Sequence, residues 1–271
     1  MPTTAHSVPD ISVPVLPTNH QGGARANRTT VTAKSPRAYA RWAGVLALVL
    51  VVCGPFSMMY VPTTVVVPGD AAATAEKLVA AESLFRFGIL SDTVIILTEV
   101  VIIGLLYSLL KPVNATVSLM AAMARLAMTV VIGVNVMNNI VVLLLLSGAG
   151  YLGAFSPGQL HALALLFLNV HEQVVHIWEA FFALHCLLLG FLIFRSRFVP
   201  RVLGPLMAMA AAGYLASAFG NLLYPESEAI LAPIVAITAI LGELPFFLWL
   251  LIKGVDVAVW QRLASKTESE A

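Results

Sequence analysis

Six long apolar runs, separated by short polar or basic segments, occupy most of this chain and constrain its fold more than any other feature. A helix of roughly 20 apolar residues is long enough to cross a bilayer core of about 30 Å. Only helices and closed barrels satisfy their backbone groups in lipid, and the period-two alternation of a barrel strand is absent from the sequence. We therefore expect an all-α polytopic membrane protein, an antiparallel bundle of six transmembrane helices at about residues 42–61, 84–110, 117–146, 160–194, 202–223 and 229–252.

The composition agrees with a lipid environment and excludes several other classes. Hydrophobic residues make up 59% of the chain and charged residues only 11%, whereas soluble domains carry about a quarter charged residues. The net charge of +1 gives no indication of a nucleic-acid partner. The two cysteines, Cys53 and Cys186, both lie inside apolar runs, so a disulfide framework or a CxxC redox site is excluded.

The segments outside the apolar runs define the domain organisation. Residues 1–37 are rich in Pro, Ser, Thr and Gly and lack any periodicity, which predicts a disordered cytoplasmic tail. Residues 38–254 form the transmembrane domain, and residues 255–271 form a polar cytoplasmic C-terminal tail. Asp70 precedes a run of strong helix formers, which predicts a short extracytoplasmic helix after the first span.

The basic residues predict the orientation, because cytoplasmic loops of membrane proteins carry an excess of Lys and Arg. Twelve of the fifteen Lys and Arg residues fall on one side of the predicted spans. Both termini should therefore be cytoplasmic, in a protein of the cell membrane whose main partner is the lipid bilayer. The residues on this side are Arg25, Arg28, Lys34, Arg37, Arg41, Lys111, Arg195, Arg197, Arg201, Lys253, Arg262 and Lys266.

Four ionisable residues fall at mid-bilayer depth on four different predicted helices: Glu99, Arg125, His185 and Glu243. Counting about 1.5 Å per residue from the cytoplasmic boundary places all four about 15–18 Å deep. Such a group costs about 2.5–3.5 kcal/mol to insert, so it must be paired, neutral or hydrated. We expect a buried Glu99–Arg125 ion pair with Glu243 or His185 nearby, either as a structural network or as a proton or ion path.

A second polar layer is predicted nearer the extracytoplasmic face. Glu172, His176 and Glu179 follow each other at spacings of four and three, so they share one helix face, and Asn169 and Asp92 belong to the same layer. A Glu–His–Glu face is a weak candidate for a metal site, and the HExxH pattern is absent. A water-lined or substrate-binding patch and purely structural contacts are the alternatives.

Several short segments carry a resemblance to a known family. They lie between residues 65 and 196 and are spaced in family order. The sequence resembles the bacterial multi-pass membrane family catalogued as domain of unknown function 4386, over about residues 38–252. This resemblance implies a six-helix bundle in the cytoplasmic membrane and assigns no activity, cofactor or catalytic residue. The segments are Val65–Ala75, Glu82–Arg86, Leu109–Asn114, Ala154–Pro157, Leu163–Asn169, Leu184–Gly190 and Leu192–Ser196.

No common catalytic signature is found in the loops. A Gly-rich phosphate loop, a GxSxG motif and a paired metal motif are all absent from the sequence. We therefore expect a non-enzymatic integral membrane protein with a buried polar cluster, with no catalytic residue and no cofactor assigned. The alternatives are a small proton- or ion-coupled transporter and an intramembrane metal-dependent enzyme; a small-molecule or proton ligand and the oligomeric state remain open.

Overall fold

The computed structural model describes residues 35–269, which are helical throughout their regular structure and contain no strand. Six of the described segments are long and apolar enough to cross a membrane, which confirms the predicted class of an all-α polytopic bundle. The predicted disordered tail lies almost entirely outside the described residues. The spans are α1–η1–α2 (Pro36–Pro55, Phe56–Tyr60 and Val61–Val65), α4 (Glu82–Leu110), α5 (Ala115–Leu145), α6 (Pro157–Ser196), α7 (Leu203–Leu223) and α8 (Glu228–Ile252).

Local capping residues explain where several helices begin. Asp70 accepts a hydrogen bond from the Ala73 amide at 2.9 Å, and the short helix α3 (Ala71–Ala80) follows it as predicted. At the start of α6, Ser156 and Gln159 form a reciprocal capping box, which satisfies two amides that the first helical turn leaves free. The remaining elements are the 3₁₀ turns η2 (Gly150–Ala154) and η3 (Pro225–Ser227) and helix α9 (Val257–Ser269).

The first span is longer than the apolar pattern predicts. It passes through Pro62, which the sequence indicates as a breaker, and ends at Val65. A π-helical turn, η1, precedes Pro62 and follows Pro55. A π turn with i→i+5 bonding is a local widening of a helix, and the two prolines at its borders lack the amides that regular helical bonding would require.

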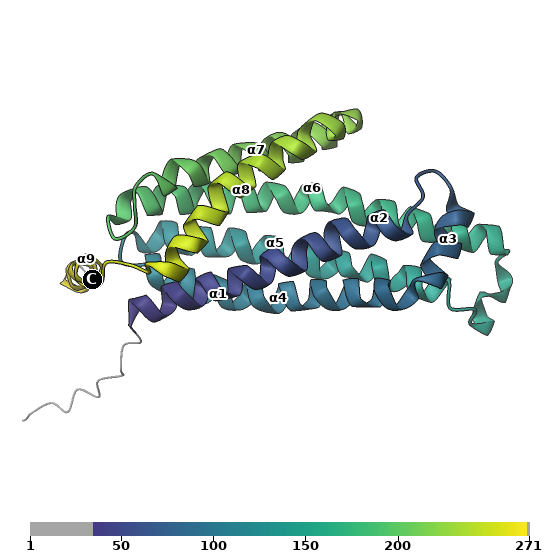
Figure 1. The fold of residues 1–271 in the computed structure, drawn as a ribbon, viewed down its shortest axis with the longest axis horizontal. Coiled ribbons are helices and arrows are strands. Elements are labelled where there is room, and N and C mark those ends of the chain that lie inside the picture. The colour runs from purple at the N-terminus through teal and green to yellow at the C-terminus, as the bar shows by residue number, and fades with distance from the viewer. Residues whose placement is uncertain (1–34, 270–271) are drawn as a thin grey trace, which may run out of the picture. The chain divides into compact units, whose positions relative to one another are not determined.

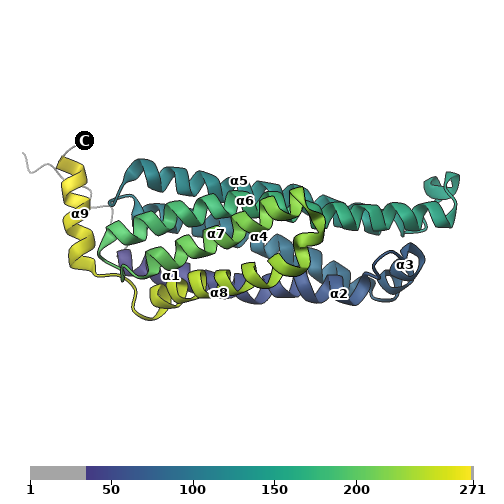
Figure 2. The same cartoon turned by 90° about the horizontal axis from the view of Figure 1, so that it is seen from above.

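The six spans form a ring in which each packs against its two neighbours over at least part of its length. The packed pairs are α1–α4, α4–α5, α5–α6, α6–α7, α7–α8 and α8–α1. Figures 1 and 2 show the antiparallel course of these helices, with α3 at one end of the bundle. We refer to that end as the α3 end, and to the opposite end, where α1 begins and α8 ends, as the terminal end.

Glycines allow close approaches between neighbouring helices of this ring, as two contacts illustrate. A Cβ added at Gly190 on α6 would lie 2.7 Å from the Gly204 carbonyl oxygen on α7, so only glycine allows these backbones to touch. A Cβ added at Gly44 on α1 would lie 2.6 Å from Leu251 Cβ on α8. Close packing through small residues is common between membrane helices, and here it joins α8 to α1 near the terminal end.

The segment predicted as a polar C-terminal tail contains helix α9, which lies across the terminal end of the bundle (Figure 2). The Trp260 indole N–H donates to the Leu109 carbonyl at 2.8 Å, and the Thr267 hydroxyl donates to the Pro112 carbonyl at 3.3 Å. Trp260 and Leu263 pack against the bundle core. The apolar face of α9 therefore docks onto the end of the bundle.

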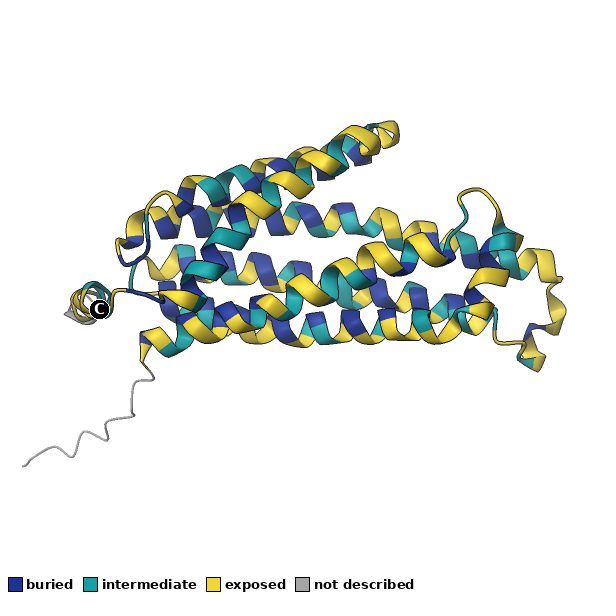
Figure 3. Cartoon of the chain, viewed as in Figure 1, coloured by how far each residue is buried: buried dark blue, intermediate teal, exposed yellow. Residues whose placement is uncertain are grey.

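Large apolar side chains cover the outward faces of the spans, and Figure 3 shows these faces as exposed along the length of the bundle. Leu97 on α4 is 64% exposed and Met137 on α5 is 61% exposed. An apolar surface of this extent is unfavourable in water. It is the surface expected where the surrounding solvent is lipid.

Candidate functional site

The centre of the bundle contains a bidentate ion pair between α4 and α5. Arg125 Nε donates to Glu99 Oε2 at 2.5 Å, and Arg125 Nη2 donates to Glu99 Oε1 at 3.0 Å. Arg125 is 2% exposed and Glu99 is 5% exposed. The two side chains neutralise each other, and this geometry matches the planar guanidinium fork to both carboxylate oxygens.

His185 on α6 completes the coordination of the guanidinium. Its Nε2 lies 3.0 Å from Arg125 Nη1, and its Nδ1 lies 2.8 Å from the Ala121 carbonyl oxygen. Because an arginine only donates and a carbonyl only accepts, Nε2 must accept and Nδ1 must carry the proton. His185 is thus a neutral imidazole with both nitrogens occupied, and it positions Arg125 between α5 and α6.

Glu243 on α8 is the fourth member of the predicted mid-depth set, and it lies apart from the ion pair. Its Oε1 accepts a hydrogen bond from the Tyr214 hydroxyl on α7 at 2.8 Å. Across residues 35–269, no basic side chain lies within 4.0 Å of this carboxyl group. Glu243 is therefore an acid at mid-span whose hydrogen-bond partner is neutral.

Three aromatic rings on α6 and α7 form a cluster that contacts both Glu243 and Arg125. Trp178 stacks on Phe182 with ring centroids 5.3 Å apart, and Tyr214 meets both rings edge-on at 5.9 and 5.0 Å. The Arg125 guanidinium lies 5.4 Å from the centroid of Phe182. The Trp178 Nε1 atom is buried and has no hydrogen-bond partner among the described residues.

A cavity of about 500 Å³ lies inside the ring of helices, and every span contributes to its wall. Most of the wall is apolar, and the polar side chains gather in one region. This volume falls within the range of pockets that hold drug-sized ligands, which are also mainly apolar with a few placed polar groups. The polar and aromatic side chains of the wall are Glu99, Arg125, Thr129, Trp178, Glu179, Phe182, Tyr214, Glu243 and Phe247.

The cavity opens sideways between α1 and α8. Its wall includes Met59 in η1, which is 65% exposed, and Ile240 on α8, which is 59% exposed. At the terminal end the Gly44–Leu251 contact joins the two helices, whereas α8 runs away from α1 toward its own beginning (Figure 1). The opening is thus bordered by apolar side chains that face outward from the bundle.

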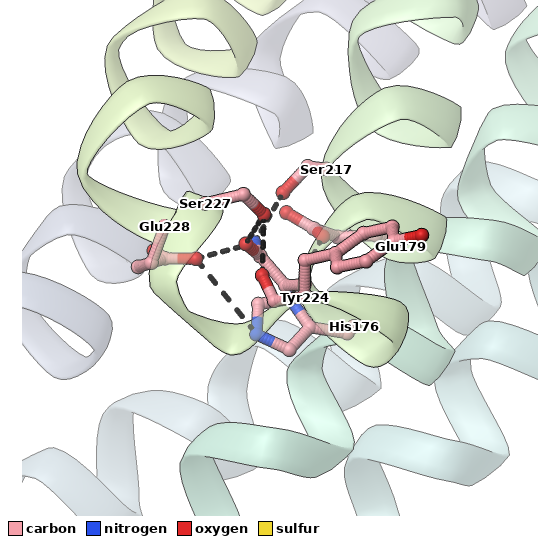
Figure 4. Close-up of polar contacts among 7 residues, drawn as sticks. His176, Glu179, Ser217, Tyr224, Ser227 and Glu228 are labelled. Atoms are coloured by element: carbon pink, nitrogen blue, oxygen red, sulfur yellow. Dashed lines mark hydrogen bonds and ion pairs between the residues drawn. The ribbon is translucent and has the colours of Figure 1, made fainter.

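Part of the predicted outer layer forms a second polar cluster, between α6, α7 and α8. His176 Nδ1 lies 3.2 Å from Glu179 Oε2, and His176 Nε2 lies 3.9 Å from Glu228 Oε2. Asn221 donates to Glu228, and Ser227 donates to Asn221 Oδ1 at 2.9 Å. Figure 4 shows His176, Glu179, Ser217, Ser227 and Glu228 gathered where α6, α7 and the start of α8 meet.

The other members of that predicted layer are not part of this cluster. Glu172 and Asn169 are exposed on α6, a helix of 40 residues that extends past the ends of α7 and α8 toward the α3 end. Asp92 on α4 is buried and lies next to Ser57 and His171 instead. The spacing along α6 therefore brings His176 to Glu179 and leaves Glu172 outside.

The geometry gives no support to the metal-site interpretation of Glu172, His176 and Glu179. Within residues 35–269, no group of three or more His, Cys, Asp or Glu side chains is arranged so that it could hold a metal ion. Glu172 lies outside the cluster, and the second carboxyl group near His176 comes from Glu228 at the start of α8.

Several residues of the site were not among the sequence candidates. Tyr214 and Asn221 carry the helical spacing of ordinary packing polar groups, and Trp178 and Phe182 are typical of apolar spans. Glu228 follows a Pro–Glu–Ser turn and has no periodic signal. Counting the helical rise along α7 would place Tyr214 near mid-span, but that signal does not reveal its contact with Glu243.

Taken together, the fold and the site define a class: a six-helix polytopic membrane protein with a buried ion pair and a largely apolar cavity at its centre. The chain belongs to the family described as "Domain of unknown function (DUF4386)", whose family model matches residues 42–254. It is 27% identical over 170 residues to an "Uncharacterized protein" from Archaeoglobus fulgidus, a match that covers 62% of this chain and 84% of that protein. No solved structure matches the chain.

Proposed function

We propose that this protein is a non-enzymatic membrane protein that binds a small, largely apolar molecule in its central cavity and exchanges it for a proton on Glu243. It would then act as a small proton-coupled transporter. The observation that carries the proposal is the cavity itself, because all six spans line it and it reaches an acid that has no basic partner.

The ion pair and the lone acid have different roles in this proposal. Glu99, Arg125 and His185 are hydrogen-bonded to one another, which fits a structural network that joins α4, α5 and α6. Glu243 is hydrogen-bonded to the Tyr214 hydroxyl and is attracted by Arg125 only at longer range, and a carboxylate without a close counterion in a bilayer interior is costly. We infer that Glu243 binds a proton when the cavity is empty and releases it when a ligand compensates its charge.

The other titratable groups around Glu243 do not provide a free positive charge that could neutralise its carboxylate in place of the proton. The guanidinium is already bound by Glu99 and His185, and Glu179 is engaged by His176. The wall contributed by α1 contains no titratable side chain. The groups that face Glu243 from the neighbouring spans are Glu99, Arg125, Glu179, Cys186 and Tyr214.

The orientation belongs to the same proposal. We propose that the terminal end faces the cytoplasm, in the cell membrane, because the basic residues of the described loops gather there. A phosphatase or fluorescent reporter fused after Ala271 reads out the side directly. Activity of a periplasmic reporter at that position would overturn the orientation.

A test of the exchange uses proteoliposomes with an imposed pH gradient and a pH-sensitive dye inside. Three probes of different charge are added in turn: ethidium (cationic), 8-anilinonaphthalene-1-sulfonate (anionic) and N-phenyl-1-naphthylamine (neutral). At least one probe should accelerate the collapse of the gradient with the native protein and with Glu172→Gln, but not with Glu243→Gln. If none of the three does so with the native protein, the proposal is wrong.

A further inference from the structure

The cavity wall contains more acidic than basic side chains, and this excess of carboxyl groups indicates a positively charged ligand. Three carboxyl groups line the wall, from Glu99, Glu179 and Glu243, against one guanidinium, from Arg125. Arg125 is bound by both oxygens of Glu99, and Glu179 is paired with His176. Glu243 is therefore the one acid of the three that has no basic partner among the described residues.

The aromatic side chains add a second, independent indication. Trp178, Phe182 and Tyr214 form a continuous cluster in the wall beside Glu243. Aromatic faces attract cations, most strongly where water is excluded. The Arg125 guanidinium already lies 5.4 Å from the centroid of Phe182, so one cation–aromatic contact is present in the site.

The remainder of the wall is apolar, and this indicates how hydrophobic the ligand must be. It consists mainly of aliphatic side chains from α1 and α8, among them Val51 and Ile240, and it opens between these two helices. A strongly hydrated ion such as Na⁺ would lose its hydration shell against such a wall and gain few oxygen ligands. An organic cation with apolar substituents fits both the wall and the acid.

From these observations we propose that the ligand of the central cavity is a lipophilic organic cation, whose charge lies beside Glu243 and the Trp178–Phe182–Tyr214 cluster. This inference rests on the proposed exchange function and specifies its substrate class. Binding is a single exchange step. The cation pairs with the Glu243 carboxylate, and the proton that Glu243 carried is released to solvent.

The test compares two probes of the same shape and opposite charge, tetraphenylphosphonium and tetraphenylborate. Binding to the purified full-length protein in detergent is measured by calorimetry, with empty micelles as the blank. We expect the native protein to bind tetraphenylphosphonium and not tetraphenylborate. Glu243→Gln should weaken phosphonium binding by about 10- to 100-fold, the range for loss of a charged partner.

Two further variants separate a site effect from a folding effect. Glu172→Gln removes an exposed carboxyl group on α6 and should leave binding unchanged. Ala239→Phe places a ring in the cavity wall and should abolish binding, whereas Ile237→Phe alters an exposed position on the same helix and should not. Each variant must retain the native elution profile and thermal midpoint.

The possible outcomes distinguish this inference from the function on which it rests. Equal or preferred binding of tetraphenylborate, blocked by Ala239→Phe, would overturn the cationic ligand and leave a ligand-binding cavity. Binding of tetraphenylphosphonium that Glu243→Gln does not weaken would overturn the role of Glu243. If neither probe binds and no probe in the vesicle assay moves protons, both the ligand class and the proposed function are wrong.

Discussion

Truncation of Arg125 to alanine is the perturbation whose cost the structure specifies best. The substitution removes three donors, two to Glu99 at 2.5 and 3.0 Å and one to His185 at 3.0 Å. It leaves a carboxylate that is 5% exposed without its counterion. Removing one partner of a buried pair costs about 3–5 kcal/mol, which corresponds to about two to three and a half orders of magnitude in the folding equilibrium.

The double variant Glu99→Gln, Arg125→Ala tests whether that cost comes from the unpaired charge. The glutamine is neutral, so the double variant should recover part of the loss, with a coupling energy of about 2–3 kcal/mol between the two positions. The assay is equilibrium unfolding in mixed micelles for both single variants and the double variant. Glu172→Gln serves as the control, because its side chain is exposed.

One result would refute this reasoning. If Arg125→Ala costs less than about 1 kcal/mol, or if the two substitutions are additive within about 0.5 kcal/mol, the pair does not hold α4 to α5. The network of Glu99, Arg125 and His185 would then be free to take part in transport instead.

Three other substitutions probe the packing and the second polar cluster. His176→Ala leaves the buried Glu179 without the partner that lies 3.2 Å away, and mixed-micelle unfolding should show a loss of about 1–3 kcal/mol. Gly44→Leu would force its Cβ to within 2.6 Å of Leu251 Cβ, so the variant should show a lowered thermal midpoint. Trp260→Phe removes the 2.8 Å hydrogen bond from the indole to the Leu109 carbonyl. We expect α9 to be cleaved faster by a protease, while the stability of the bundle stays unchanged.

The helix count and the level of the buried charges followed from the sequence because both depend on helical rise alone. A rise of about 1.5 Å per residue fixes depth once the span boundaries are known, and Glu99, Arg125 and His185 do meet at one level. Depth carries no information about direction around the bundle axis. The sequence therefore left open whether Glu243 or His185 joins the ion pair, and the hydrogen bond from Tyr214 to Glu243 was not predicted.

The outer layer illustrates the limit of same-face spacing. The i, i+3 relation correctly places His176 against Glu179, but the same stripe also contains Glu172, which is exposed. Whether a residue of α6 is buried depends on which neighbouring helix covers α6 at that level. The distance by which α6 extends past α7 and α8 depends on the packing of the whole bundle and cannot be read from the spacing along α6. Glu228, 52 residues after His176 in the numbering, reaches it only because α8 begins beside α6 at that height.

The first span and the C-terminal segment differ from their sequence patterns for local reasons. A proline normally ends a helix when its missing amide would have been bonded. Here the π turn η1 precedes Pro62 and the helix continues to Val65. The polar composition of residues 255–271 conceals an amphipathic helix, because the apolar side chains of Trp260 and Leu263 recur on one face and dock on the bundle.

The most direct test of the account is a proton count on ligand binding at the central cavity. Tetraphenylphosphonium is added to the purified protein in a weakly buffered detergent solution, and the pH change is recorded together with binding. The account predicts that the native protein and Glu172→Gln release protons in proportion to the probe bound, and that Glu243→Gln releases none. Binding by the native protein without proton release, or release that persists in Glu243→Gln, would contradict it.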